Sequence, residues 1–298
     1  MAEKTQQKAQ WTIKQLLEWT TEHFSQAGVE QARLCAELLL AEVLGCQRID
    51  LYIKFDHCPD EEQRGRLREY VKRCAAHEPV AYVLGKAHFY SLELKVSPAV
   101  LIPRSETEVL VTQAIDYCRH ETNRPTVAVL DLCTGSGCIA IALAAHVVET
   151  EIVALDRSAA ALEIARHNIE NHALAARITL VRSDLFDNIN QANKVVFDLI
   201  VANPPYISAA GYENLPANVR DYEPPEALLG GADGLEVHKR IIDRAHPYLA
   251  DGGALMLETA YNQAEQIVAL CAASGYLKEI TAVRDSLGHK RVVKALKK

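Results

Sequence analysis

An amide, two prolines and an aromatic ring stand together directly after a run of apolar residues. The run 197–202 has the length of a buried strand, and Asn203, Pro204, Pro205 and Tyr206 follow it. Successive prolines fix φ and donate no backbone hydrogen bonds, so this corner is stiff and rich in carbonyl oxygens. The Asn203 side-chain oxygen and the Pro204 carbonyl could accept both hydrogens of a planar NH2 group while the Tyr206 ring lies against its face. The motif therefore suggests a clamp for an amide or an exocyclic amine, although a strand followed by a rigid turn has the same residues.

A second motif, upstream of the first, has the form of a nucleotide-binding loop. Asp131 lies at the end of an expected strand, and a helix is expected to begin at the end of the loop. The glycines of the loop let a ligand approach the backbone, and the helix N-terminus offers unpaired N–H groups. The residues expected to bind a cofactor here are Asp131, Cys133, Thr134, Gly135, Ser136 and Gly137.

Acidic residues also end the next two expected strands. Asp156, with Arg157 beside it, is placed to accept hydrogen bonds from a ribose diol. Asp184, with Leu185 beside it, could accept a hydrogen bond from an adenine amino group. Together with Asp131, these carboxylates at the ends of three neighbouring strands describe an adenosine-shaped pocket.

Two cofactors compete for that pocket. The pattern Gly135-x-Gly137-x-x-Ala140 also satisfies the dinucleotide fingerprint of nicotinamide-dependent oxidoreductases, in which a pyrophosphate sits on the helix N-terminus. Asp131, placed at the mouth of the loop, would repel a diphosphate and attract the ammonium group of an aminoacyl sulfonium. The acid and the order of the strands favour S-adenosylmethionine.

The apolar pattern around both motifs alternates between strand and helix. We expect an α/β fold in which a seven-stranded, mostly parallel sheet is covered on both faces and its last strand is antiparallel. The expected strands span 127–132, 151–156, 178–182, 196–202, 253–258, 276–283 and 290–296, and the expected helices span 137–147, 159–172, 234–250 and 261–274. Residues 207–233 form a long insertion directly after Tyr206, which is typical of a functional loop.

The first third of the chain has a different organisation. Residues 1–10 are polar and expected to be frayed, and the remainder up to residue 85 has helical periodicity, so we expect an N-terminal helical bundle over 1–85 that recognises the substrate. The pattern then changes to a β-hairpin linker over 86–102, followed by a catalytic domain over 103–298. Ser105 and Glu108 satisfy the capping-box pattern for a helix that begins there.

Composition excludes several classes of protein. The net charge of −7 argues against a surface that grips a phosphate backbone, so we expect no direct binding of nucleic acid. The eight cysteines form no C-x-x-C pair and no metal-ligand spacing, which indicates reduced thiols and no structural metal. No apolar stretch is long enough to cross a bilayer and no signal peptide is evident, so we expect a soluble, cytoplasmic protein, and we expect a monomer.

With these residues assembled, the chain resembles the peptide chain release factor glutamine methyltransferases, the PrmC/HemK family. The resemblance covers the helical domain, the hairpin, Leu101-Ile102-Pro103-Arg104-Ser105-Glu106-Thr107-Glu108, the glycine loop, Asp156, Asn203–Tyr206 and Gly288-His289-x-Arg291. Three positions depart from the family pattern: Ser105 replaces a second proline, Cys133 a glycine, and Lys290 a frequent acid. None of them removes a group that the chemistry needs.

The resemblance implies S-adenosylmethionine-dependent methylation of a glutamine side-chain nitrogen in the Gly-Gly-Gln loop of bacterial class 1 release factors. It also implies that Arg104 and Thr107 shape the cavity where the methionine end of the cofactor meets the glutamine, alongside the four residues of the amide clamp. Glu258 ends the fifth strand beside the site, in either a structural or a functional role. The adenine-N6 DNA methyltransferases share the Asn-Pro-Pro-Tyr motif and remain an alternative, as does a non-catalytic module that kept the fold.

Overall fold

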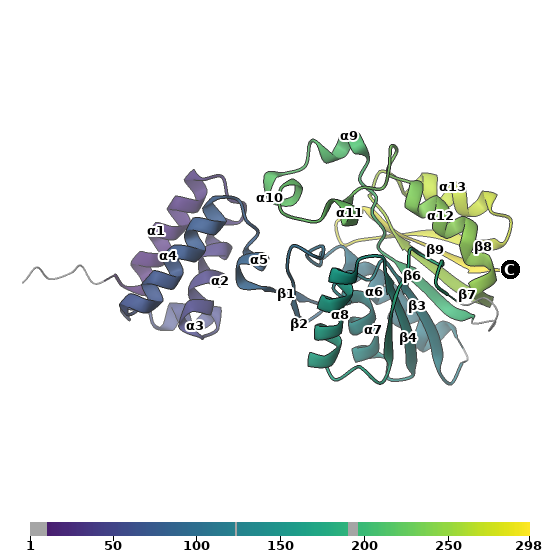
Figure 1. Cartoon of the computed structure of the whole chain (residues 1–298), viewed down its shortest axis with the longest axis horizontal. Coiled ribbons are helices and arrows are strands. Elements are labelled where there is room, and N and C mark those ends of the chain that lie inside the picture. The colour runs from purple at the N-terminus through teal and green to yellow at the C-terminus, as the bar shows by residue number, and fades with distance from the viewer. Residues whose placement is uncertain (1–10, 123, 190–195) are drawn as a thin grey trace, which may run out of the picture. The chain divides into compact units, whose positions relative to one another are not determined.

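The computed structural model describes residues 11–122, 124–189 and 196–298. The chain divides into two compact units, which join between Gly85 and Lys86, and each unit has its own apolar core (Figure 1). The polar stretch 1–10, expected to be frayed, lies outside the described residues.

The first unit is helical, as predicted. Thr12 and Asp60 each close a capping box at the start of a helix, and Gly45 and Gly85 end two of the others in the left-handed conformation. Side chains that recur at helical spacing meet in one core, in which Phe24, Leu39 and Leu51 are fully buried. The helices are α1 (Ile13–Gln26), α2 (Ala32–Leu44), α3 (Arg48–Ile53), α4 (Glu61–Ala75) and α5 (Val80–Leu84).

The second unit begins with a β-hairpin and continues as alternating strands and helices. Its first elements are β1 (Lys86–Phe89), β2 (Leu92–Lys95), α6 (Thr107–Asp116), the π-helix η1 (Tyr117–Glu121), β3 (Val127–Leu132), α7 (Cys138–His146), β4 (Thr150–Asp156), α8 (Ala159–Asn171), β5 (Ile178–Arg182) and β6 (Phe197–Ala202). Then come α9 (Ala209–Tyr212), α10 (Ala217–Arg220), α11 (Pro225–Leu228), α12 (Glu236–Ala245), the 3-10 helix η3 (His246–Tyr248), β7 (Leu249–Glu258), α13 (Ala264–Ala273), β8 (Leu277–Arg284) and β9 (Lys290–Lys297).

The main sheet has seven strands in the order β5-β4-β3-β6-β7-β9-β8. The pairs from β5 to β7 are parallel, whereas β9 pairs antiparallel with both β7 and β8. This arrangement confirms the predicted fold class. The carboxyl ends of β3, β4, β5, β6 and β7 therefore meet at one edge of the sheet.

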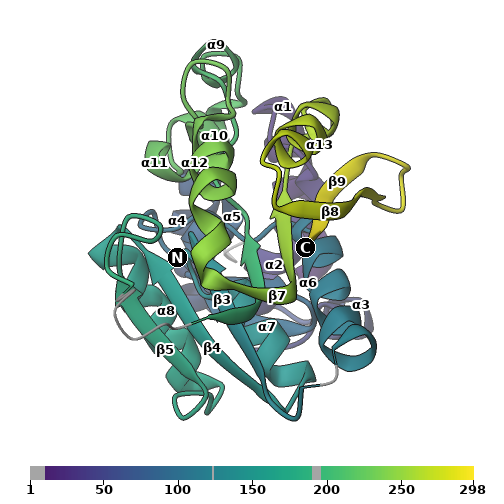
Figure 2. The ribbon, with the colours of Figure 1, turned by 90° about the vertical axis from the view of Figure 1, so that its right-hand side faces the viewer.

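Alternation along the strands divides the core of this unit into two layers. On β6, Leu199 and Val201 face α6 and α7, whereas Ile200 and Ala202 face α12 and α13. Figure 2 shows these two groups of helices on opposite sides of the strands. Because both faces are covered, the strands are almost uniformly apolar up to their carboxyl ends, where polar residues begin.

Three expectations about local structure are corrected. The hairpin pairs only Lys86–Phe89 with Leu92–Lys95, so its strands end well before residue 102. The helix expected over 234–250 ends at Ala245, and β7 already begins at Leu249. The register of β7 with β6 shifts between Leu249 and Ala254, so Gly252 and Gly253 lie in a bulge within β7, and the strand begins ahead of residue 253, where it was expected.

The third correction concerns the helix start at Ser105. Helix α6 begins at Thr107 after Glu106, and no side chain caps it. The Ser105 hydroxyl instead donates to the Glu106 carboxylate at 3.0 Å, and the Glu108 carboxylate accepts from the backbone N–H of Tyr90 in the hairpin at 2.8 Å. A contact with the hairpin has thus replaced the local capping box.

Candidate active site

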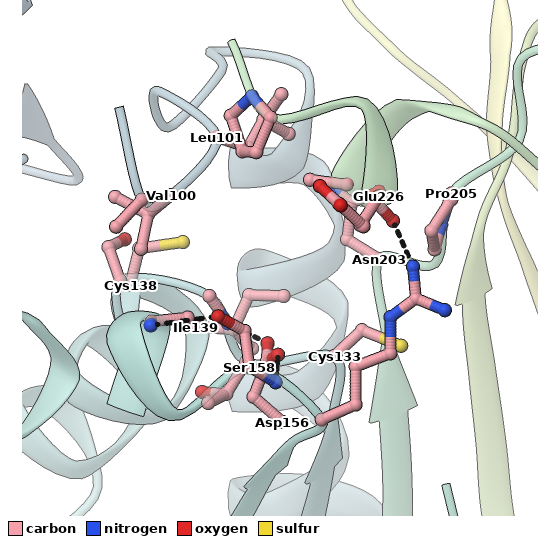
Figure 3. Close-up of a pocket in the computed structure, with 18 of the residues that line it drawn as sticks. Val100, Leu101, Cys133, Cys138, Ile139, Asp156, Ser158, Asn203, Pro205 and Glu226 are labelled. Atoms are coloured by element: carbon pink, nitrogen blue, oxygen red, sulfur yellow. Dashed lines mark hydrogen bonds between the residues drawn. The ribbon is translucent and has the colours of Figure 1, made fainter. Parts of the chain in front are cut away.

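A cavity of about 560 Å³ opens at the carboxyl edge of the parallel strands, within the second unit. Its walls come from the segments after β3, β4, β5 and β6, from residues 98–107, and from the insertion ahead of α12 (Figure 3). The predicted site residues that line it are Arg104, Thr107, Cys133, Thr134, Gly135, Ser136, Asp156, Arg157, Asp184, Leu185, Asn203 and Pro205. Four others do not line it: Asp131, Gly137, Pro204 and Tyr206.

The glycine loop turns sharply between β3 and α7. Gly135 and Gly137 have φ values of 56° and 82°, which only glycine adopts without strain, and a Cβ atom on Gly137 would lie 3.2 Å from the Ile141 side chain. Cys133 also has a positive φ, of 59°. The loop therefore requires a left-handed residue at the position where this chain departs from the family pattern.

Asp156 holds that loop from the neighbouring strand. Its Oδ2 accepts from the backbone N–H of Gly135 at 2.9 Å, and its Oδ1 accepts from the backbone N–H of Ser158 at 2.9 Å (Figure 3). Burial raises the pKa of the carboxyl, and the two N–H groups oppose that effect. Each carboxylate oxygen can accept a further hydrogen bond, so Asp156 is able to bind a diol in the cavity.

Two buried polar atoms, one on Asp131 and one on Ser136, lack hydrogen-bond partners within the described residues. Asp131 is fully buried, its Oδ2 accepts from the Thr134 hydroxyl at 2.6 Å, and its Oδ1 has no partner within the described parts of the chain. The Ser136 hydroxyl is likewise unpaired there. Burial raises the pKa of Asp131 to about 7. Asp131 is thus fully buried and does not line the cavity, whereas it was expected at the mouth of the loop, and burial favours its neutral form more than the sequence argument assumed.

Charged residues also line the cavity. Asp184 accepts from Arg240 at 2.8 Å, and both side chains are partly exposed. Arg157 donates to the backbone carbonyl of Glu226 in the insertion at 3.2 Å. Arg240 and Glu226 were not singled out from the sequence, because neither belongs to a motif.

Asn203 enters the cavity directly after β6 (Figure 3). Its Nδ2 donates to the hydroxyl of Thr107 at 3.1 Å, so the two residues predicted to share the substrate end of the site are in contact. Pro205 also lines the cavity. Tyr206 is half-buried, its pKa is raised mainly by burial, and its carbonyl accepts from Gln263 at 3.0 Å.

The insertion is fastened to the segment before α6 by one buried acid that sequence reasoning missed. The Glu223 side chain is 1% exposed, forms an ion pair with Arg104, and accepts from the backbone N–H of Ile102 at 3.1 Å. Two prolines follow Glu223 and restrict the backbone there, and this was the feature of the sequence that could have indicated a fixed position for the acid.

Within residues 11–122, 124–189 and 196–298, no group of three or more His, Cys, Asp and Glu side chains could hold a metal ion. In the same ranges, no helix is long and apolar enough to cross a membrane.

Comparison with known proteins assigns both units. Residues 15–85 match the family described as the PrmC N-terminal domain, and residues 114–216 match the methyltransferase small domain. A release factor glutamine methyltransferase of Rhodopirellula baltica is 45% identical, covering 98% of this chain and 98% of its own length. One of Geobacter sulfurreducens is 42% identical, covering 95% and 96%. A solved methyltransferase of Pyrococcus furiosus, 16% identical, has a TM-score of 0.51 over 76% of this chain and 96% of its own, which is a likeness in fold alone.

Proposed function

The chain belongs to the release factor glutamine methyltransferase family, and from this premise we propose that it methylates the side-chain nitrogen of the Gly-Gly-Gln glutamine in bacterial class 1 release factors. The methyl donor proposed is S-adenosylmethionine. The observation that carries the proposal is the position of Asn203, which enters the cavity beside the glycine loop and contacts Thr107. An acceptor of amide hydrogens and a nucleotide-type loop thus face one cavity.

The residues present fit the donor. Asp156 would accept hydrogen bonds from the ribose, with Arg157 next to it, and the segment Ser183–Leu185 would border the adenine. The Ser136 hydroxyl lines the cavity and has no partner within the described residues, so a polar group of the donor would give it one. When bound, S-adenosylmethionine supplies an electrophilic methyl group.

The acceptor requires help because an amide nitrogen is a poor nucleophile, its lone pair being delocalised into the carbonyl. Asn203 Oδ1 and the Pro204 carbonyl would accept its two N–H bonds, orient the nitrogen and stabilise the positive charge that develops there. Tyr206 would pack against the planar amide. The nitrogen would take the methyl group as the sulfonium leaves as a thioether, and the nitrogen, acidic once methylated, would then lose its proton to water.

One labelling experiment tests the function. The protein would be incubated with S-adenosylmethionine labelled in its methyl group and, in separate reactions, with a release factor, the same release factor with the motif glutamine replaced by alanine, and duplex DNA. We expect label on the unaltered release factor alone. Label on DNA would favour the adenine-N6 alternative, and label on the glutamine-free release factor would exclude the assigned acceptor.

We also propose that the first unit recognises the release factor, because a loop glutamine offers little binding surface by itself. A groove of about 430 Å³ between α1 and α4 supports this role, and Trp11, Trp19, Leu67 and Arg68 line it. Trp19 is 50% exposed, and its ring stacks on His23 with centroids 5.1 Å apart. A rigid, half-exposed aromatic ring is typical of an interface anchor.

The setting of the reaction follows from its substrate. Release factors act on ribosomes, so we propose that this protein works in the cytoplasm, as a monomer that contacts a protein partner and not nucleic acid directly. The acidic net charge of −7 supports the last point.

A further inference from the structure

A buried acid stands behind the amide clamp. Glu258 ends β7, the strand next to β6, and Leu257 pairs with Ala202, so Glu258 and Asn203 leave the sheet side by side. Glu258 is 1% exposed, and its Oε2 has no hydrogen-bond partner within the described residues. Its backbone carbonyl accepts from His238 Nε2 at 2.8 Å, which holds the end of the strand in place. Burying an acid with one unpaired oxygen lowers stability, so Glu258 contributes poorly as a structural residue.

Thr107 connects this acid to Asn203. The Thr107 hydroxyl lies close enough to the Glu258 carboxylate to lower its pKa as a donor would, and its oxygen accepts from Asn203 Nδ2 at 3.1 Å. A hydroxyl has one proton to donate, and a carboxylate can only accept. A Thr107 hydroxyl that turns its proton toward Glu258 can meet Asn203 only as an acceptor. The NH2 group of Asn203 must therefore face Thr107.

We propose that Glu258, acting through Thr107, is a positioning residue that keeps the Asn203 Oδ1 turned toward the substrate nitrogen. This inference rests on the proposed function, since only a clamp that accepts N–H bonds distinguishes the two ends of the carboxamide. A carboxamide rotated by half a turn would present its own N–H donors to the substrate NH2 group. That arrangement brings donor against donor, and it would abolish the alignment.

The ionisation of Glu258 sets the direction of this hydrogen-bond chain. Burial raises the pKa of Glu258 to about 7, and the Thr107 hydroxyl opposes that effect. When protonated, Glu258 can donate to Thr107, whose own proton is then free to turn toward Asn203. The kcat should therefore fall as the pH is lowered through about 7.

Other groups also act on Glu258. Glu106 raises its pKa, whereas Arg291 and Arg104 lower it. His238, on α12, is neutral near pH 7 because burial lowers its pKa to about 4. The Tyr206 phenol also interacts with the charge of Glu258, and burial, with that charge, raises the pKa of Tyr206 far above neutral pH. Glu258 is thus the group in this cluster that changes charge near neutral pH.

Substitutions in the full-length protein test the proposal. Glu258→Gln keeps the size of the side chain but can donate to Thr107, and Thr107→Val keeps the shape but removes the hydroxyl. Both should lower kcat roughly tenfold to hundredfold, while the release factor KM and the donor Kd stay within about threefold. Thr107→Ser should recover most of the kcat that Thr107→Val loses. Glu265→Gln, which removes an exposed carboxylate on α13, is the control.

Two further readouts separate positioning from a structural role. Glu258→Gln removes a buried charge, so its Tm should be equal to or above that of the unaltered protein, and its kcat should lose the acidic limb near pH 7. A fall in Tm that accounts for the lost activity, or an unchanged kcat in both variants, would overturn the inference. Asn203→Ala distinguishes a failure of the proposed function from a failure of this inference. Full kcat in Asn203→Ala would contradict the clamp itself. Loss of kcat in Asn203→Ala, with unchanged kcat in Glu258→Gln and Thr107→Val, would contradict only the role of Glu258.

Discussion

Asn203 and Asp156 both line one cavity, yet they should affect different kinetic parameters. Asn203→Ala should lower kcat by roughly 10²- to 10³-fold, because it removes an acceptor that stabilises charge on the nitrogen during transfer. Asp156→Ala should instead weaken donor binding at least tenfold, by roughly 1.4 kcal/mol or more, since it removes the ribose acceptor and releases the N–H of Gly135. Calorimetry with the donor and initial rates would show the separation. Equal donor affinity in Asp156→Ala would remove that residue from the ribose role.

Cys133 carries backbone strain that a glycine would not. Its φ of 59° is unfavourable for any residue with a Cβ atom. Cys133→Ala keeps the strain and Cys133→Gly relieves it, while both remove the thiol. We therefore expect the glycine variant to be more stable than the alanine variant by about 1 kcal/mol, measured by thermal or urea unfolding. If the alanine variant proved the more stable, the loop would not hold this residue in the left-handed region.

Sequence reasoning at the residue scale located the cavity better than it located charges. Motif residues such as Gly135, Asp156 and Asn203 line one cavity because the ends of parallel strands must meet. The complete burial of Asp131 was not predictable, since the sequence does not show how much of a strand end the following loop covers. Glu223 was missed because its partner, Arg104, is more than a hundred residues away in the chain.

Among the elements, the insertion over 207–233 is joined to the segment before α6 through the buried Glu223. Glu223→Gln keeps the side-chain size but removes the charge that pairs with Arg104, so we expect a loss of about 1–3 kcal/mol of stability and faster proteolysis within the insertion. Asp221→Asn is a matched control, because the pair of Asp221 with Arg220 is exposed and should contribute less than about 1 kcal/mol. Thermal unfolding with limited proteolysis would compare the two. Similar behaviour of both variants would contradict the fastening.

Elements with a strong apolar period were predicted to within a few residues, and elements shaped by distant contacts were not. The seven strands follow from short apolar runs whose two faces are both buried. The strand expected to begin at residue 253 begins at Leu249, and Gly252 and Gly253 lie in a bulge inside it. Similarly, Glu108 fits the sequence pattern of a capping box, whereas in the structure its carboxylate accepts a hydrogen bond from the backbone N–H of Tyr90 in the hairpin.

For the whole molecule, the two units should divide binding from chemistry. Trp19→Ala should raise the release factor KM roughly tenfold or more, with kcat at saturating substrate and donor Kd little changed, because the exposed ring on α1 belongs to the proposed recognition surface and not to the cavity. Ile53→Ala, which truncates a side chain that is 74% exposed on α3 outside the groove, is the control. Equal KM values for the two variants would place the recognition surface elsewhere.

The pairing of β3 with β6 has a mechanical consequence. Leu132 and Ala202 are register partners, so the donor loop and the amide corner emerge from adjacent strands at the same level. The hydrogen-bonded spacing of strands, about 4.8 Å, is among the least compliant dimensions in a protein. The sheet would therefore fix the separation between the proposed donor and acceptor. Thermal motion of the surrounding loops would alter the residence times of the donor and the acceptor, while the backbone of β3 and β6 would set the distance that the methyl group crosses.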